Sequence, residues 1–231
     1  MIGTELLDDP RSDPVLVGRE LRDIARLNAL FGGTRAVVRE LEPFFERGKR
    51  DRGNGKRETW TLLDVGTGLG DIPRAAAAAA WRHGITLRLV GIELSRTAAR
   101  LARAGGLATV VADGSALPLA PRAVDVVVAS QVLHHLPRPV AVHWIATLDR
   151  IARRAVVLAD LRRSRVAMAG VWAASVGLAM SGVTRHDAVV SLKRGYTKTE
   201  FDEMLRQAGV RTVARYRPGA RIVAAWSPST E

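Results

Sequence analysis

Apolar residues are arranged in two different ways along this chain. Before residue 46 they recur every three or four positions, and a Gly32-Gly33 pair interrupts the series. This spacing predicts two helices within residues 13–45. The stretch that follows, residues 47–58, is charged and contains glycine, so we expect a solvated linker there.

From residue 60 onward, apolar runs of strand length alternate with helical stretches. The expected strands are residues 61–65, 87–93, 109–112, 124–130, 155–160, 210–216 and 221–226, and the expected helices are residues 72–83, 96–104, 140–150 and 199–208. Strands that are apolar on both faces and alternate with helices predict an α/β fold with a doubly wound, mostly parallel seven-stranded sheet. Only Arg217-Pro218-Gly219 joins the last two strands. This connection is too short for a crossover helix, so the last strand is expected to be antiparallel.

A stretch of 18 residues without charge, 166–183, interrupts this alternation. Its length is at the lower edge for a membrane-spanning helix, but it is rich in Ala, Gly and Ser. We interpret it as a buried helix or a lid, with an interfacial helix and a true span as alternatives. We therefore expect a helical lid and linker in residues 1–58, and a core in residues 59–231 with a helical insertion at 164–187.

Composition narrows the class of protein. The 231 residues are 47% hydrophobic, which is enough to bury a core, and the absence of cysteine excludes disulfides and thiolate chemistry. The acidic N-terminus lacks the plan of a signal peptide, so a cytoplasmic protein is expected. Lipid contact through residues 162–183 is left open, because three arginines precede the uncharged stretch. The net charge of +12 admits a polyanionic partner, but the few aromatic residues are not interleaved with the basic runs, which argues against nucleic acid.

The most informative segment is a glycine-rich turn at residues 62–71, with the sequence Leu-Leu-Asp-Val-Gly-Thr-Gly-Leu-Gly-Asp. A strand, a turn with three alternating glycines and a helix follow one another, and the spacing differs from the G-x-G-x-x-G of nicotinamide-binding proteins. Glycines let the backbone bend sharply and let a ligand approach closely. Asp64 would repel a pyrophosphate but would accept hydrogen bonds from an ammonium group. The turn therefore indicates a cationic nucleoside ligand, unless it is only a tight connection.

Two further carboxylates stand at the ends of the next predicted strands. Glu93 ends the second strand, where it can accept hydrogen bonds from ribose hydroxyls, and Asp113 with Gly114 follows the third, where Asp113 can accept from an exocyclic amine. Each alone could be a cap or a turn residue. Together they lie along the edge at which parallel sheets bind ligands, which favours a nucleoside site.

Residues 60–136 resemble the class I S-adenosylmethionine-dependent methyltransferases, in particular the quinone-biosynthesis-like (type 11) branch. Residues 64–70 resemble the first motif of this family, and residues 124–130 resemble its fourth motif, followed by Gln-Val-Leu-His-His-Leu at 131–136. The resemblance implies S-adenosyl-L-methionine as the cofactor and S-adenosyl-L-homocysteine as its product. The positions that it assigns to the cofactor are Asp64, Gly66, Thr67, Gly68, Gly70, Glu93, Leu94, Asp113, Gly114 and Ser130.

Short motifs at 28–35, 160–164 and 184–187 are similar to those of bacterial methyltransferases found beside aromatic polyketide synthases. This similarity implies O-methylation of a small phenolic or quinol acceptor, with a lipid tail as one option. C-methylation of a quinol ring and RNA methylation, which the basic charge favours, are the alternatives, along with a non-catalytic cofactor-binding protein. The sequence leaves the acceptor and the oligomeric state open.

Histidine is the side chain suited to accept the proton of a phenol near neutral pH. The candidate bases are His134 and His135, which follow the fourth strand, and His186, which follows the uncharged stretch. The paired histidines could instead only pack or bond to the backbone. No metal is expected, because the chain has no Cys, no H-x-x-x-H pair and no evident cluster of carboxylates.

Overall fold

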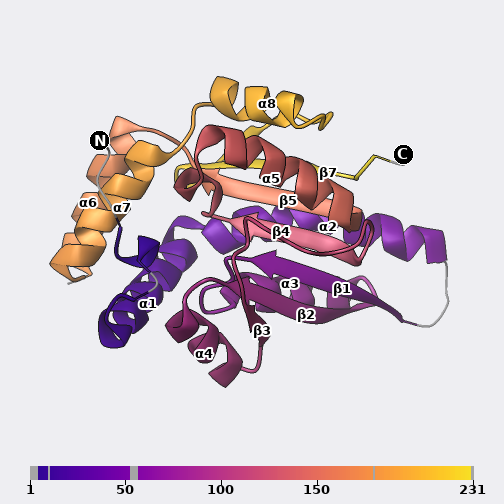
Figure 1. Ribbon diagram of the computed structural model, residues 1–231, viewed down its shortest axis with the longest axis horizontal. Coiled ribbons are helices and arrows are strands. Elements are labelled where there is room, and N and C mark those ends of the chain that lie inside the picture. The colour runs from indigo at the N-terminus through magenta and orange to yellow at the C-terminus, as the bar shows by residue number, and fades with distance from the viewer. Residues whose placement is uncertain (1–4, 10, 53–56, 179, 230–231) are drawn as a thin grey trace.

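The computed structural model describes residues 5–9, 11–52, 57–178 and 180–229, and within them the chain forms a seven-stranded sheet (Figure 1). The strand order is β3-β2-β1-β4-β5-β7-β6. The strands are β1 (Glu58–Val65), β2 (Ile85–Glu93), β3 (Ala108–Val111), β4 (Val124–Ser130), β5 (Ala152–Leu161), β6 (Arg215–Arg217) and β7 (Arg221–Trp226). β1 to β5 are parallel, whereas β7 is antiparallel to both β5 and β6. The doubly wound sheet with a reversed last strand is confirmed.

Helices cover both faces of the sheet and one of its ends (Figure 1). They are η1 (Leu6–Asp8), α1 (Pro14–Phe31), α2 (Gly33–Arg52), α3 (Asp71–Arg82), α4 (Arg96–Ala104), η2 (Leu133–His135), α5 (Arg138–Ile151), α6 (Arg165–Gly177), α7 (Gly182–Arg194) and α8 (Lys198–Gln207). The Asp13 side chain caps α1 by accepting from the amides of Val15 and Leu16, and Gly32 ends this helix in the left-handed region. The predicted break at the glycine pair is therefore confirmed.

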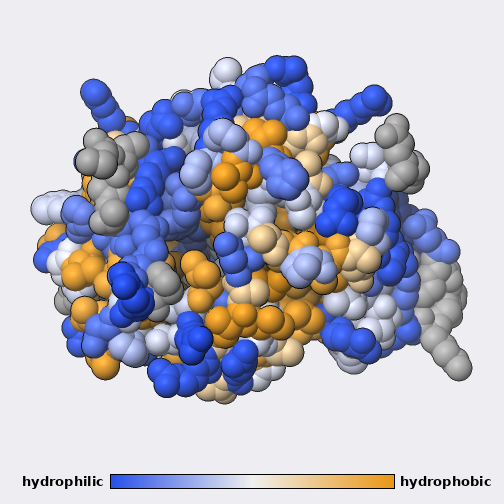
Figure 2. Space-filling model, viewed as in Figure 1, coloured by the Kyte–Doolittle hydropathy of each residue, from blue (hydrophilic) through white to orange (hydrophobic). Residues whose placement is uncertain are grey.

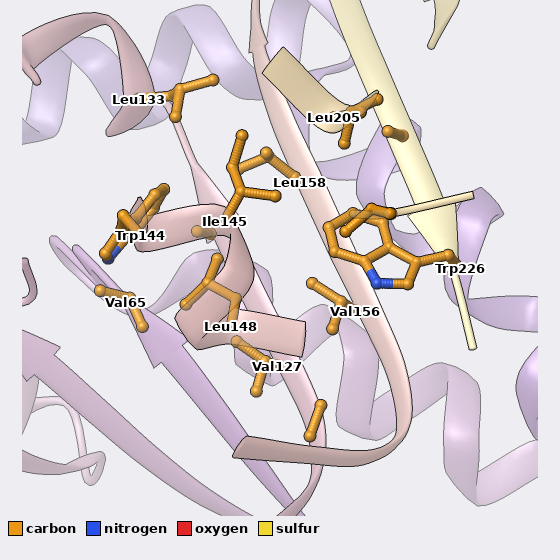
Figure 3. Close-up of a cluster of buried hydrophobic side chains, with 14 of the residues drawn as sticks. Val65, Val127, Leu133, Trp144, Ile145, Leu148, Val156, Leu158, Leu205 and Trp226 are labelled. Carbon is orange, nitrogen blue, oxygen red and sulfur yellow. The ribbon is translucent and has the colours of Figure 1, made fainter. Parts of the chain in front are cut away.

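The core lies on both faces of the central strands. On one face, Val127 of β4 and Leu158 of β5 pack with Trp144 of α5 and residues of α8 (Figure 3). On the other face, Val126 and Val128 pack with α2 and α3. Because successive side chains of a strand point to opposite faces, β4 has to be apolar almost throughout.

The second N-terminal helix is longer and more deeply packed than the sequence suggests. α2 continues to Arg52, so residues 47–52 are helical rather than linker, and residues 53–56 lie outside the described part. Val37, Leu41 and Phe45 of α2 are completely buried against the sheet. α2 is therefore part of the core, and a lid formed by the N-terminal residues stays a prediction.

The uncharged stretch is two helices rather than one. α6 ends at Gly177, and Ser181 starts α7 by accepting a hydrogen bond from the amide of Thr184. Among the described residues, no helix is both long enough and apolar enough to cross a membrane.

The expected strand at 210–216 is shorter in the structure, since only Arg215–Arg217 pairs with β7.

Gly219 holds the β6–β7 hairpin against the end of α1. Its φ is +74°, and a Cβ at this position would stand 1.9 Å from the carbonyl oxygen of Phe31. Gly106 has a similar φ of +82°, with nothing within 4 Å of such a Cβ.

Gly106→Ala should lower the free energy of unfolding by about 1–2 kcal/mol, the cost of left-handed backbone. Gly219→Ala should lower it further, because the hairpin must also move away from Phe31. Urea unfolding of both variants measures the difference, and equal losses would contradict this packing.

Candidate functional site

A cavity of about 510 Å³ lies at the carboxyl ends of β1, β2 and β4. Its walls are the glycine-rich turn, the loops after these strands, α1, α7 and the segment around η1. α1, α6 and α7 lie together at this end of the sheet (Figure 1). The volume is in the range of small-molecule and cofactor sites.

The glycine-rich turn is held by a carboxylate from the neighbouring strand. Gly66 and Gly68 have φ of +74° and +54°, and the amide of Gly68 donates to Glu93 Oε2 over 2.9 Å. The amide of Ser95 donates to the other oxygen of Glu93 over 3.2 Å. Burial raises the pKa of Glu93, and this effect outweighs the hydrogen bonds, which lower it. The turn and Glu93 therefore form one unit of the cavity wall.

Asp64 does not line the cavity itself, but it lies directly behind Thr67, which does. It is 1% exposed, and its Oδ2 accepts a 2.7 Å hydrogen bond from the hydroxyl of Thr67. Its Oδ1 has no hydrogen-bond partner among the described residues. Burial raises the pKa of Asp64 to about 7. A buried oxygen that lacks a donor fits a position that receives one when a ligand binds.

Most of the predicted cofactor positions line the cavity, and two do not. Eight of the ten line the cavity: Gly66, Thr67, Gly68, Glu93, Leu94, Asp113, Gly114 and Ser130. The exceptions are Asp64 and Gly70, and Gly70 instead stands at the start of α3 with a left-handed φ. The Asp113 carboxylate accepts from the amide of Ser115, which shapes the loop after β3.

His134 lines the same cavity and is oriented by a buried carboxylate. Its Nδ1 lies 2.7 Å from Asp160 Oδ1, and its amide donates to Asp160 Oδ2 over 3.1 Å. Its Nε2 has no hydrogen-bond partner among the described residues, and the residue lines the cavity. Burial alone lowers the pKa of His134, but the Asp160 carboxylate outweighs this effect, and the net pKa is raised. The arrangement is that of a base with an orienting acid.

Asp160 is absent from the predicted site. It is completely buried at the end of β5, beside the end of β4 that leads to His134. The signal in the sequence is an acidic residue at the end of an otherwise apolar strand, the same signal that identifies Glu93.

The other two candidate histidines differ from His134. His135 also lines the cavity, but its Nδ1 pairs with Asp8. Its pKa is lowered, mainly by burial and then by the charge of His134. His186 is exposed on α7 and does not line the cavity, so the structure does not bring it to the site. The next residue, Asp187, does line the cavity, together with Ser191 one helical turn later.

Glu5, His134 and His135 offer ligand atoms within 4.8 Å of one another, the one such metal-type group found among the described residues. Arg194 already supplies a cation there, since it donates to Glu5 Oε1 over 3.2 Å and to Asp8 Oδ2 over 3.0 Å. The absence of a metal requirement stays a prediction.

The α1 wall of the cavity contributes polar residues that the sequence analysis missed. Glu20 is buried, and burial together with the nearby Asp187 raises its pKa to about 8. Asn28 accepts hydrogen bonds from Gln131 over 3.0 Å and from Arg221 over 2.6 Å. These residues are far apart in the sequence, and only the packing of α1 on the sheet brings them together.

Comparison with known proteins agrees with this geometry. Residues 63–159 match the family described as methyltransferase domain. An uncharacterized methyltransferase of Mycobacterium ulcerans (strain Agy99) is 43% identical over 83 residues, which cover 34% of this chain and 30% of that protein. The matched part thus spans less than a third of the curated relative.

Solved structures share the fold at low identity. A SAM-dependent methyltransferase from Aquifex aeolicus is 17% identical with a TM-score of 0.53, covering 89% of this chain and 98% of that one. Magnesium protoporphyrin IX methyltransferase (ChlM) from Synechocystis PCC 6803 with bound SAH is 16% identical with a TM-score of 0.53, covering 86% and 83%. The plantazolicin methyltransferase BamL is 15% identical with a TM-score of 0.55, covering 79% and 65%.

Residues 63–159 thus match a methyltransferase domain, and the chain shares the fold of solved S-adenosylmethionine-dependent methyltransferases. The residues of the cavity fit the cofactor of this class. Glu93 and Asp113 line the cavity from the ends of β2 and β3, and Asp64 at the end of β1 has an Oδ1 without a hydrogen-bond partner among the described residues.

Asp64 should make the stability of the ligand-free protein depend on pH. Its pKa of about 7 lies above the ordinary 3.8, so the folded state disfavours the ionised form. The resulting destabilisation is absent below about pH 4 and complete above pH 7. Asp64→Asn should therefore raise the free energy of unfolding by roughly 2–4 kcal/mol at pH 8, with no gain at pH 4. Urea unfolding at both pH values tests this, with Asp51→Asn as an exposed control. A gain of the same size at both values would contradict it.

Proposed function

We propose that the protein transfers a methyl group from S-adenosylmethionine to an oxygen of a small phenolic or quinol acceptor. The observation that carries the proposal is one cavity that joins a nucleoside-type site to Nε2 of His134, which has no hydrogen-bond partner among the described residues and lies 3.8 Å from Glu5 Oε1. Binding two reactants in one cavity makes their reaction effectively unimolecular.

The cofactor end of the cavity is assigned by its hydrogen-bonding groups. Glu93 is placed to accept from ribose hydroxyls and Asp113 from the adenine amine, while Gly66 and Gly68 let the ligand approach the backbone. The bound cofactor would supply a methyl group on a positively charged sulfur; a nucleophile that bonds to the methyl carbon displaces the sulfur as a neutral thioether.

His134 is the proposed base at the acceptor end. A phenol has a pKa of about 10 and is a weak nucleophile until it loses its proton. The proton would pass from the phenol oxygen to Nε2 of His134, and that oxygen would take the methyl group and release S-adenosylhomocysteine. Asp160 holds Nδ1 of the ring and stabilises the imidazolium that forms.

Apolar residues of the cavity support an aromatic acceptor. Ile24, Leu27 and Phe31 of α1 and Val171 of α6 line it. α6 also exposes Val166 and Trp172, and Figure 2 shows apolar surface among hydrophilic side chains at the end where α6 and α7 lie. An apolar helix that borders both the cavity and the solvent suits a lipophilic acceptor and contact with lipid through residues 162–183.

Cofactor binding is tested first by calorimetry with S-adenosylhomocysteine. Glu93→Gln should weaken binding about 10-fold or more, because a charged hydrogen bond contributes about 1.5–3 kcal/mol. Glu203→Gln, a change of the same kind on the exposed side of α8, should bind as the wild type does. Equal affinity of the wild type and Glu93→Gln would contradict the assignment of the ribose to Glu93.

His134→Gln should lower kcat with a phenolic acceptor by about 10²–10⁴-fold while leaving the affinity for S-adenosylhomocysteine within about twofold. Raising the pH toward the pKa of the phenol should restore part of the rate, because the acceptor then ionises without a base. His186→Gln should retain the wild-type rate, since that side chain is exposed away from the cavity.

Asp160→Asn adds a second readout to this test. His134 acts as a base only when neutral, so the rate falls as the pH drops below its pKa. Because Asp160 raises that pKa, the acid limb of kcat in Asp160→Asn should move to lower pH. An unchanged acid limb in Asp160→Asn would overturn the role of His134. Full activity of His134→Gln, both with and without chelator treatment, would overturn it as well.

A further inference from the structure

Arg221 is a buried arginine with donors that no protein group uses. It begins β7, pairs in register with Leu161 at the end of β5, lines the cavity and is only 4% exposed. Its Nη2 donates to Asn28 Oδ1 over 2.6 Å. Its Nε and Nη1 have no hydrogen-bond partner among the described residues.

The surroundings of Arg221 are built for a fixed position. Asn28 Oδ1 also accepts from Nε2 of Gln131, a residue with a φ of +60° directly after β4. Gly33 leaves room for this pair, since a Cβ there would stand 2.8 Å from Asn28 Oδ1 and 3.0 Å from Arg221 Nη2. Four segments, from α1, α2, the loop after β4 and β7, thus hold one guanidinium at the cavity.

The nearby carboxylates already have other hydrogen-bond donors. Asp71 accepts from the hydroxyl of Thr34 over 2.9 Å, and Asp160 accepts from His134. Neither forms an ion pair with Arg221 within the described chain. Burial lowers the pKa of Arg221 to about 10, so the side chain remains a cation at neutral pH. A buried, unpaired cation is unfavourable unless an anion completes the site.

We infer that Arg221 is a carboxylate-binding subsite of this cavity, with Nε and Nη1 as the donors to the ligand. Guanidinium–carboxylate hydrogen bonds are among the strongest in proteins, and they are stronger still in a site shielded from water. The choice of ligand rests on the proposed function, which brings two sources of a carboxylate into the cavity. These are the amino-acid end of the cofactor and a carboxylate on the acceptor.

Calorimetry on the full chain distinguishes the two sources. The first pair of probes is S-adenosylhomocysteine and its decarboxylated analogue. The second pair is 4-hydroxybenzoate and phenol, each added to protein saturated with S-adenosylhomocysteine. The variants are Arg221→Gln and, as a matched control on the same hairpin, Arg215→Gln, whose side chain is exposed.

If the cofactor supplies the carboxylate, the wild type and Arg215→Gln should bind S-adenosylhomocysteine at least ~10-fold more tightly than its decarboxylated analogue. Arg221→Gln should reduce this preference to within about twofold. If the acceptor supplies it, Arg221→Gln should keep that preference but lose at least ~10-fold in affinity for 4-hydroxybenzoate and none for phenol.

Gly33→Ala provides a second variant that keeps the charge but displaces the guanidinium. It should reduce the same preference for the carboxylate-bearing ligand that Arg221→Gln reduces. This variant decides the test if Arg221→Gln fails to fold. Normal binding of S-adenosylhomocysteine with neither ratio changed would overturn the subsite and leave the proposed function standing. A wild type that binds no S-adenosylhomocysteine would overturn the proposed function and the subsite with it.

Discussion

Helices cover both faces of β4 and β5, so polar groups of these strands reach a ligand only at the carboxyl edge of the sheet. Val126 to Ala129 and Val156 to Leu158 are completely buried. Parallel strands place all their carboxyl ends at that one edge. The glycine-rich turn, Glu93, Asp113 and His134 therefore meet at one cavity, and Asp160 holds His134 from behind it, although about a hundred residues separate the turn from Asp160.

The same edge contains buried polar atoms without partners. Asp64 Oδ1, His134 Nε2 and two nitrogens of Arg221 have no hydrogen-bond partner within the described chain. Folding alone disfavours such atoms, because an unpaired buried polar group loses its hydration without replacement. Asp64 lies beneath the turn, whereas His134 and Arg221 line the cavity from two further sides. Their distribution outlines a site for a cofactor and a second reactant.

The sequence predicts what depends on local pattern. β4 and β7 have the bounds expected from their apolar runs, and eight of the ten cofactor positions line the cavity, because strand ends and turns are local features. The pairing of Asp160 with His134 and the cluster of Asn28, Gln131 and Arg221 depend on contacts across the chain that one sequence does not reveal. His186 is exposed on α7 and the next residue, Asp187, lines the cavity, because the face of α7 that turns inward is set by contacts across the chain.

We propose that this cavity brings S-adenosylmethionine and an acceptor oxygen together beside His134. Mass spectrometry of the products formed from methyl-deuterated S-adenosylmethionine and a panel of phenols and quinols tests it most directly. We expect the labelled methyl group on an oxygen of at least one acceptor, in an amount equal to the S-adenosylhomocysteine released. Labelled methyl on a ring carbon, or no transfer to any member of the panel, would contradict it.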